Sequence, residues 1–310
     1  VEAYEYTLGL LEKLTPHQEE VLSKCEDTKR IHIRAVAGSG KTFVAVARVR
    51  KMLEARKRVL FVCTGTALAC MFAVWVYNRL SNQEKRAPDP LRDLFFLFQE
   101  AGSPQLKGCS VQAGRVKFEK CGTQDCSGNM PSFALVIVDE AHHIFANSAM
   151  KESCERFFQM TQLMLLSDAS QAVEFEREGK FPEDLLDVRL TEVVRSTQRI
   201  TQAAAGFQKG TDSPTTLEGQ PIGAPLKSFV FDTTGKEPSA DFVDRLKVSQ
   251  DDRDIACYTW FTTEALRHVM KTFQNLSLHN RVALLVPSTD FCNLLRPCIE
   301  TAVAERSPKS

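Results

Sequence analysis

Short apolar runs alternate with longer amphipathic segments along most of the chain. The runs that predict strands are 30–36, 58–64, 133–140, 163–168, 228–233, 254–260 and 281–287. Helical periodicity between them predicts helices over 41–55, 66–80, 150–161, 263–276 and 290–306. Runs such as "LVIV" and "LMLL" are apolar at every position, as central strands of a parallel sheet require. The pattern therefore predicts an α/β fold, with parallel sheets covered by helices on both faces.

The same pattern predicts two domains. Residues 209–226 are rich in Gly, Pro, Ser and Thr, which favours a linker there. We expect a first domain over 1–208 and a second over 227–310. A further stretch, 101–131, reads as irregular, and we interpret it as an insertion on the first domain.

A glycine-rich turn, "AVAGSGKT", lies between the first predicted strand and the first predicted helix. Gly38 and Gly40 let successive backbone N–H groups point into one concavity at a helix start, which suits a phosphate. Lys41 supplies charge to the β- and γ-phosphates, and the Thr42 hydroxyl can hold Mg²⁺. The predicted nucleotide contacts of this turn are Ala37, Gly38, Ser39, Gly40, Lys41 and Thr42.

An acidic pair, Asp139 and Glu140, ends the apolar strand "LVIV". Ligands of open parallel sheets gather at the carboxyl ends of the strands, so Asp139 is expected to reach the Mg²⁺. Glu140 is placed to orient or deprotonate a water that attacks the γ-phosphate. His142 and His143 follow, and we interpret them as a polar edge of this site rather than as metal ligands, because adjacent histidines point apart.

The amino-acid composition removes one argument for nucleic-acid binding and leaves others open. Lys and Arg together number 39, as do Asp and Glu, so the chain lacks the strong positive charge of many nucleic-acid-binding proteins. Ten cysteines include Cys63 and Cys257 in apolar runs, which favours reduced core thiols and a cytoplasmic or nuclear location. Neither a secretory signal nor an apolar run of membrane-spanning length is expected.

Three cysteines in the 101–131 stretch raise a metal question. Cys109, Cys121 and Cys126 could form part of a zinc site, with a fourth ligand from Cys154 or His142. Zinc sites usually show two close ligand pairs, and only "CGTQDC" is close here, so core or surface thiols remain the favoured interpretation.

Six segments in order resemble the motifs of superfamily 1 helicases of the UvrD and Rep type. They are "LTPHQEEVL" (14–22), "AVAGSGKT" (35–42), "TGTALA" (64–69), "VDEAHH" (138–143), "LLSDASQ" (165–171) and "LTEVVRSTQRI" (190–200). The NTPase region of Schlafen proteins is similar more loosely. The resemblance covers residues 14–200.

The resemblance implies a RecA-like P-loop ATPase domain with a partial second RecA-like lobe, which binds ATP and Mg²⁺. It implies that Gln18 reads adenine and that Gln171 contacts the γ-phosphate or its water. It also implies that Arg195 neutralises charge on the transferring phosphoryl group, with Arg199 in reserve. Single-stranded DNA or RNA is the implied partner.

Two departures support an alternative. The family's nucleic-acid-contacting segment carries aromatic and polar side chains, whereas this chain has Gly65, Ala67 and Leu68. The family's last two motifs are not found in the sequence. The alternative is a non-translocating ATP-dependent switch, similar to the Schlafen type, that acts through protein or RNA partners.

Overall fold

The structure is a computed structural model, and it describes most of the chain. The described residues are 13–112, 115–121, 131–159, 161–168, 181–194, 196–205, 214–216, 220–223, 238–246, 253–272, 282, 284, 286 and 288–304. The chain divides into a first unit, Val1–Pro225, and a second unit, Leu226–Ser310.

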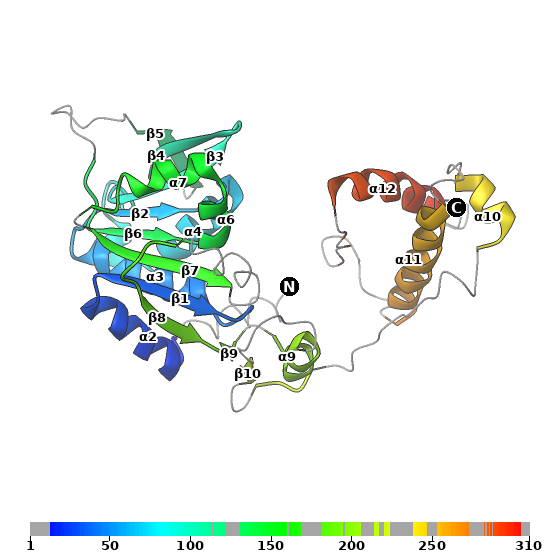
Figure 1. Cartoon of the computed structure of the whole chain (residues 1–310), viewed down its shortest axis with the longest axis horizontal. Coiled ribbons are helices and arrows are strands. Elements are labelled where there is room, and N and C mark those ends of the chain that lie inside the picture. Colours follow the sequence, from blue (N-terminus) through cyan, green and yellow to red (C-terminus); the bar gives the residue numbers. More distant parts are fainter. Residues whose placement is uncertain are drawn as a thin grey trace. The chain divides into compact units, whose positions relative to one another are not determined.

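An eight-stranded sheet forms the centre of the first unit, in the order β5-β4-β3-β2-β6-β7-β1-β8 (Figure 1). Strands β3, β2, β6, β7, β1 and β8 are parallel, and β4 and β5 extend the sheet as antiparallel strands. The strand bounds are β1 (Arg30–Ala35), β2 (Val59–Val62), β3 (Leu94–Glu100), β4 (Ser103–Gln112), β5 (Arg115–Lys120), β6 (Leu135–Val138), β7 (Gln162–Asp168) and β8 (Leu186–Leu190).

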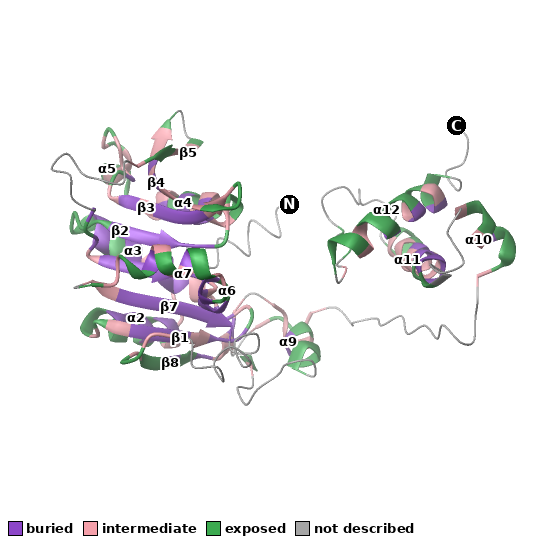
Figure 2. Ribbon diagram, turned by 45° about the horizontal axis from the view of Figure 1, so that its top comes forward, coloured by how far each residue is buried: buried purple, intermediate pink, exposed green. Residues whose placement is uncertain are grey.

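Helices cover both faces of this sheet. One face packs against α2 (Pro16–Asp27), α3 (Lys41–Glu54) and α4 (Thr66–Arg79), and the other against α6 (Ala141–Ala146) and α7 (Ser148–Glu155). Figure 2 shows the central strands as buried, with exposed residues on the outer sides of the helices. The mostly parallel α/β fold expected from the sequence is confirmed.

Shorter elements complete the first unit. They are α5 (Asn82–Lys85), β9 (Glu192–Val193), α9 (Gln198–Ala205) and β10 (Thr215–Thr216). Strand β10 lies inside the predicted linker and pairs in parallel with β9. Residues 220–223 also contact this region, since the backbone N–H of Gln198 donates to the Pro221 carbonyl at 3.0 Å. Some of the predicted linker thus packs on the first unit.

Four predicted strands, now β1, β2, β6 and β7, are confirmed, as are the helices predicted over 41–55 and 66–80. Every residue of β2 and β6 is buried, which explains their uninterrupted apolar sequence. Helix α7 is shorter than predicted and ends at Glu155.

The irregular structure expected over 101–131 was wrong for β4 and β5, and β3 was not predicted at all. The β4 sequence "SPQLKGCSVQ" contains Ser, Pro and Gly, which are uncommon in strands. Cross-strand packing outweighs that preference. The Phe118 ring of β5 lies 5.1 Å from that of Phe96 and 5.6 Å from that of Phe98, both on β3, measured between ring centres.

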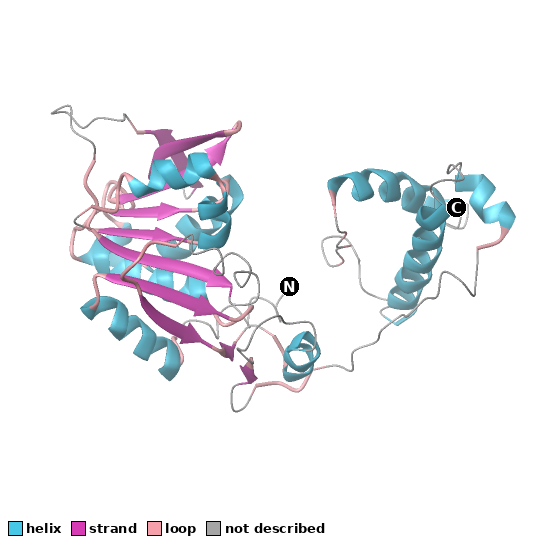
Figure 3. Cartoon of the chain, in the orientation of Figure 1, coloured by secondary structure: helices cyan, strands magenta, loops and turns pink. Residues whose placement is uncertain are grey.

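The described part of the second unit consists of α10 (Ala240–Leu246), α11 (Arg253–Thr272) and α12 (Thr289–Ala304), shown in cyan in Figure 3. Ile255, Leu295 and Cys298 form its small buried core. The helix predicted over 290–306 is confirmed as α12, and that predicted over 263–276 falls in α11 as far as Thr272.

The strand predicted over 254–260 was wrong, because these residues begin α11. Ile255, Thr259 and Thr263 are buried at four-residue spacing, which is helical. The Thr259 hydroxyl donates to the Ile255 carbonyl and the Thr263 hydroxyl to the Thr259 carbonyl, each at 2.7 Å.

The two remaining predicted strands of the second unit have different outcomes. In the run 281–287, the described residues Val282, Leu284 and Val286 have no regular secondary structure. The run 228–233 lies outside the described residues.

Candidate active site

The phosphate loop connects β1 to α3 and has the backbone shape that its glycines predict. Gly38 and Gly40 have φ angles of 83° and 85°, in the left-handed region that L-residues avoid. A Cβ on Gly40 would lie 2.6 Å from Nε2 of Gln18, so a side chain has no room there. The loop ends at Lys41, where the first N–H groups of α3 have no partner within the helix.

The acidic pair from β6 meets the end of this loop. Lys41 Nζ lies 2.7 Å from Glu140 Oε1, and the Thr42 hydroxyl donates to Asp139 Oδ2 at 3.4 Å. We call Lys41, Thr42, Asp139 and Glu140 the phosphate-loop cluster. Its four side chains come from segments almost 100 residues apart in sequence, yet they lie together at the carboxyl ends of parallel strands. The grouping expected from the sequence is therefore present.

Electrostatics distinguish the two carboxylates of this cluster. Asp139 is 1% exposed, and its burial raises the pKa to about 6, while the nearby Lys41 charge acts in the opposite direction. The side chain of Glu140 is 27% exposed. Glu140 also has a φ of 48°, a strained conformation that often marks functional positions.

Oxygen atoms of Thr42 and Asp139 suit a small, hard cation. Mg²⁺ prefers hydroxyl and carboxylate ligands, and these two oxygens lie 3.4 Å apart beside the phosphate loop. The buried Asp139 carboxylate gains from a nearby positive charge, because burial otherwise disfavours its ionised form. The donor set therefore fits the Mg²⁺ expected from the sequence.

Gln18 belongs to the same neighbourhood. It is 1% exposed, and its Nε2 donates to the Ser39 carbonyl of the phosphate loop at 2.9 Å. Its Oε1 accepts from the Thr15 backbone N–H at 3.0 Å, which completes a capping box at the start of α2. The amide thus lies against the phosphate loop.

His142 lies beside the acidic pair. Its Nε2 is 3.7 Å from Glu140 Oε2. Its ring centre is 4.2 Å from that of His143, so the expectation that the two adjacent histidines point apart was wrong. His142 is 5% exposed, so it contributes a buried polar side chain to the edge of the cluster.

Two predicted site residues, Gln171 and Arg195, lie outside the described residues. The structure does describe residues that shortly precede each of them in the sequence. Asp168 ends β7, and the Val194 backbone N–H donates to the Gly38 carbonyl at 3.0 Å. Arg199 is engaged elsewhere, since its Nη1 donates to the Gly223 carbonyl at 3.1 Å.

A buried polar group that the sequence analysis missed crosses three neighbouring strands. His32 of β1 contacts Ser167 of β7 and Asp187 of β8, and we call these three residues the strand network. One signal could have revealed it, since His32 interrupts the apolar run "RIHIRAV". A polar residue on a fully covered strand needs a buried partner.

The zinc question has a partial answer. The described residues contain no group of three or more His, Cys, Asp or Glu that could hold a metal ion. Cys109 is buried on β4, and burial raises the pKa of its thiol to about 12, which disfavours the thiolate that zinc binds. Cys121 is half-buried, and Cys126 lies outside the described residues. Cys63 and Cys257 are buried thiols, as expected.

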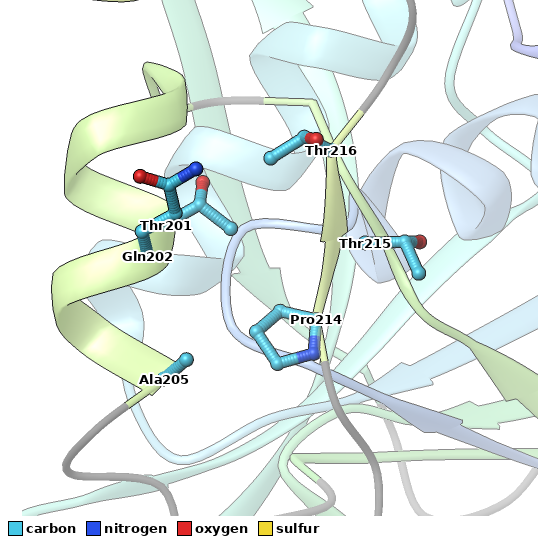
Figure 4. A pocket seen from close by; sticks show the side chains of 6 residues that line it. All are labelled: Thr201, Gln202, Ala205, Pro214, Thr215 and Thr216. Atoms are coloured by element: carbon cyan, nitrogen blue, oxygen red, sulfur yellow. The ribbon is translucent and has the colours of Figure 1, made fainter.

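A hollow of about 540 Å³ lies between α9 and β10 and does not include the phosphate-loop cluster. Figure 4 shows its walls, formed by Thr201 and Gln202 on the helix and Pro214 and Thr216 on the strand side. The Thr201 hydroxyl donates to the Thr197 carbonyl, so it is already used within α9.

Comparison with known families decides the class. The family described as "Type III restriction enzyme, res subunit" matches residues 11–167. The chain belongs to this family. The matched region contains the phosphate loop and the acidic pair. It is therefore a helicase-like P-loop ATPase domain. The match does not show the narrower superfamily 1 assignment.

Comparisons with individual proteins are distant. No curated protein matches. Among solved structures, the large terminase from a thermophilic bacteriophage has 13% identity and a TM-score of 0.37, covering 64% of this chain and 51% of that one. A mutant ATPase domain of the large terminase from a Thermus phage has 13% identity and a TM-score of 0.28, covering 50% and 65%. This family member thus spans about half the length of the first of these terminases. Among the described residues, none of the helices is long and apolar enough to cross a membrane.

Proposed function

We propose that this chain is the ATP-binding and ATP-hydrolysing core of a helicase-type enzyme. The observation that supports it most is the phosphate-loop cluster, in which Lys41 and Thr42 of the loop meet Asp139 and Glu140 of β6. A protein that only held a nucleotide would need the loop and its cation, but not a second acid beside them.

In the proposed reaction, ATP binds with its phosphates in the loop between Gly38 and Thr42. Lys41, which pairs with Glu140 in this structure, turns to the γ-phosphate and balances its charge. Thr42 and Asp139 would hold Mg²⁺, which when bound neutralises phosphate charge. Glu140, released from Lys41, orients the attacking water and accepts its proton. The water oxygen bonds to the γ-phosphorus as the bond from that phosphorus to the β,γ-bridging oxygen breaks, which gives ADP and phosphate.

Three further roles belong to this proposal. Gln18 reads the adenine edge with the amide that lies on the phosphate loop. Gln171, beyond the end of β7, contacts the γ-phosphate or its water. Arg195 directly follows Val194, which is bonded to the loop, and supplies positive charge to the transferring group.

We propose single-stranded DNA or RNA as the partner of the ATPase, in line with the superfamily 1 resemblance and with the restriction-enzyme name of the family. The proposed division of the chain is an ATPase domain over 1–208, a linker over 209–226 that packs in part on the first unit, and a partial second RecA-like lobe over 227–310. The buried free thiols favour the cytoplasm or nucleus as its location.

Nucleotide binding and hydrolysis by matched lysine variants test the core of the proposal. We expect the wild type to release phosphate from ATP in the presence of Mg²⁺, and Lys41→Ala to lose nucleotide binding measured by calorimetry. Lys51→Ala is the control, since Lys51 is exposed and pairs with Glu26 away from the cluster. Equal nucleotide affinity in Lys41→Ala and Lys51→Ala would reject the role of the loop lysine.

One observation favours the alternative, an ATP-dependent switch that does not translocate. Gly65 has open space around it, and Ala67 beside it is exposed, so this segment offers no aromatic ring for base stacking. Trp75 and Tyr77 are partly buried against the core rather than free to stack.

The ATPase rate with and without single-stranded DNA or RNA separates the two functions. Strong stimulation, together with binding that weakens as salt rises, supports the motor. An unchanged rate with no salt-dependent binding to either polymer supports the switch.

A further inference from the structure

The strand network consists of the buried His32 and Ser167 and the more exposed Asp187, on the sheet face that α6 and α7 cover. His32 Nε2 lies 2.7 Å from the Ser167 hydroxyl, and His32 Nδ1 lies 3.4 Å from Asp187 Oδ1. His32 is 2% exposed and Ser167 is fully buried. Arg34, on the same strand as His32, binds the Asp187 carboxylate from the more exposed side, with Nη2 to Oδ2 at 3.0 Å.

The chemistry of the network defines the state of the imidazole. The carboxylate of Asp187 only accepts hydrogen bonds, so Nδ1 carries the proton that faces it. Nε2 then accepts a hydrogen bond from the Ser167 hydroxyl, which is the arrangement of a neutral imidazole. Burial, with the Arg34 charge, lowers the pKa of His32 to about 4, in agreement with a neutral ring. Asp187 and His142 are the other titratable groups that act on it.

A serine, a histidine and an aspartate in this order also resemble a hydrolytic triad. Ser167 is 0% exposed and lies on a central strand of the sheet, so no substrate can reach its hydroxyl. The network therefore has a different use, which its position indicates.

The three residues lie on three adjacent strands, β7, β1 and β8, and each strand leads into a part of the proposed site. Strand β7 ends at Asp168, directly after Ser167. Strand β1 leads into the phosphate loop, and β8 leads to Val194, whose N–H donates to the Gly38 carbonyl. His32 is the residue that contacts side chains on both neighbouring strands.

We propose that His32 is a positioning residue, whose ring holds β7 and β8 in place relative to β1, the strand that leads into the phosphate loop. The proposal rests on the proposed ATPase function. Small displacements of catalytic groups reduce the rate of a reaction far more than they reduce ground-state binding. His32 is therefore expected to act on kcat and to leave nucleotide affinity almost unchanged.

The test compares His32→Phe and His32→Gln in the full chain. Phenylalanine fills the site without hydrogen bonds, whereas glutamine keeps one donor and one acceptor. We expect His32→Phe to lower kcat about tenfold with KM for ATP within about twofold of the wild type, and His32→Gln to recover at least part of the rate. His17→Phe is the control, since His17 is more exposed and contacts the Arg189 carbonyl of the same strand β8.

Amide hydrogen exchange gives a readout that needs no ATPase activity. The N–H groups of Val36, bonded to the Leu190 carbonyl, and of Val194, bonded to the Gly38 carbonyl, should exchange faster in His32→Phe than in His32→Gln. Unchanged exchange at both sites in His32→Phe would overturn the proposal, whatever the ATPase rate.

A wild-type kcat in His32→Phe, a loss confined to KM, or a His32→Gln rate no better than that of His32→Phe would also overturn it. A wild type without ATPase activity would instead reject the proposed function, with the exchange result still deciding the positioning of the strands. If neither variant folds, Ser167→Ala removes a single oxygen from the network and is expected to give the same pattern of kcat, KM and exchange.

Discussion

The phosphate-loop cluster lies at the carboxyl ends of parallel strands and the strand network lies within β7, β1 and β8, and the two groups differ in access. Lys41 and Glu140 have side chains that are 16% and 27% exposed, so a ligand can reach them. His32 and Ser167 are at most 2% exposed. Lys41 and Glu140 are open to a nucleotide, whereas His32 and Ser167 can act only through the strands that hold them.

For Lys41, Glu140, His32 and Ser167, access to solvent separates a chemical role from a positioning role, while the buried Asp139 takes part in the cluster through its contact with Thr42. Charges of the cluster are only partly satisfied within the described residues, since burial disfavours ionised Asp139 and Glu140 Oε2 has no hydrogen-bond partner there. The network is internally satisfied, with donors and acceptors matched. Substitutions in the phosphate-loop cluster should therefore abolish ATP hydrolysis, and substitutions in the strand network should lower its rate.

The largest effect in this series is expected from Asp139→Asn. Loss of the carboxylate charge beside Thr42 should lower kcat by about 10²–10³-fold, because the electrostatic balance around the phosphates is lost. Phosphate release over a range of Mg²⁺ concentrations measures it. Asp93→Asn, which lies before β3 and pairs with Arg92, should keep the wild-type rate. Comparable rates for the two variants would show that the Asp139 carboxylate has no role in the reaction.

Gly40→Ala should break the loop through its backbone. A Cβ there meets Gln18 Nε2 at 2.6 Å, and the φ of 85° is unfavourable for alanine, so the free energy of unfolding should fall by about 1–3 kcal/mol. Urea denaturation measures this loss. Gly108→Ala is the matched control, because nothing lies within 4 Å of a Cβ at that position. Equal stability of both variants would mean that the loop does not have this conformation.

Gln18→Glu tests whether Gln18 contacts the nucleotide base or only supports the phosphate loop. Glutamate can keep the capping box with Thr15, but it cannot donate to the Ser39 carbonyl or present an amide to adenine. We expect KM for ATP to rise about tenfold, with GTP affected much less, as measured by steady-state kinetics. A rise shared equally by ATP and GTP would limit Gln18 to supporting the loop.

The smallest effect is a pH dependence of stability from His32. Its pKa is about 4 in the folded chain and about 6.5 when unfolded, so the unfolded state binds the extra proton between these values. The contribution of His32 to the free energy of unfolding is therefore present in full above pH 6.5. It should fall by about 1 kcal/mol from pH 6.5 to 5.5.

Urea denaturation of the wild type and His32→Phe at both pH values isolates that contribution. The variant should lack it, while the charges of Arg34, Asp187 and His142 remain in both proteins. The same pH slope in the two proteins would show that His32 is not buried as a neutral ring.

Much of the first unit could be predicted because burial on both faces leaves a plain signal. The all-apolar "VLFV" and "LVIV" became β2 and β6, and the glycine turn after β1 identified the phosphate loop. Strand β8, "LDVRL", was missed because its Asp187 and Arg189 read as polar loop residues. The partners of Asp187, His32 and Arg34, are about 150 residues away in sequence, so the pattern within β8 could not reveal them.

The second unit could be predicted less well. The run "DIACYTW" combines β-branched and aromatic residues, which favour strands, yet it opens a 20-residue helix with buried hydroxyls. Hydroxyl groups that bond within the helix, as in Thr259 and Thr263, remove the cost of burying them. At the site, Lys41, Thr42, Asp139 and Glu140 were predicted from motif and strand position, while His32 required three-dimensional contacts.

The most direct test of the account is phosphate release by Glu140→Gln at saturating ATP and Mg²⁺, with nucleotide binding measured on the same preparation. Glu54→Gln is the control, because Glu54 is exposed on α3 and pairs with Arg50. We expect Glu140→Gln to bind ATP at least as tightly as the wild type, since Lys41 loses a competing partner, and its hydrolysis rate to fall by about 10²-fold or more. Hydrolysis at the wild-type rate in Glu140→Gln would contradict the proposed role of Glu140 in activating the attacking water.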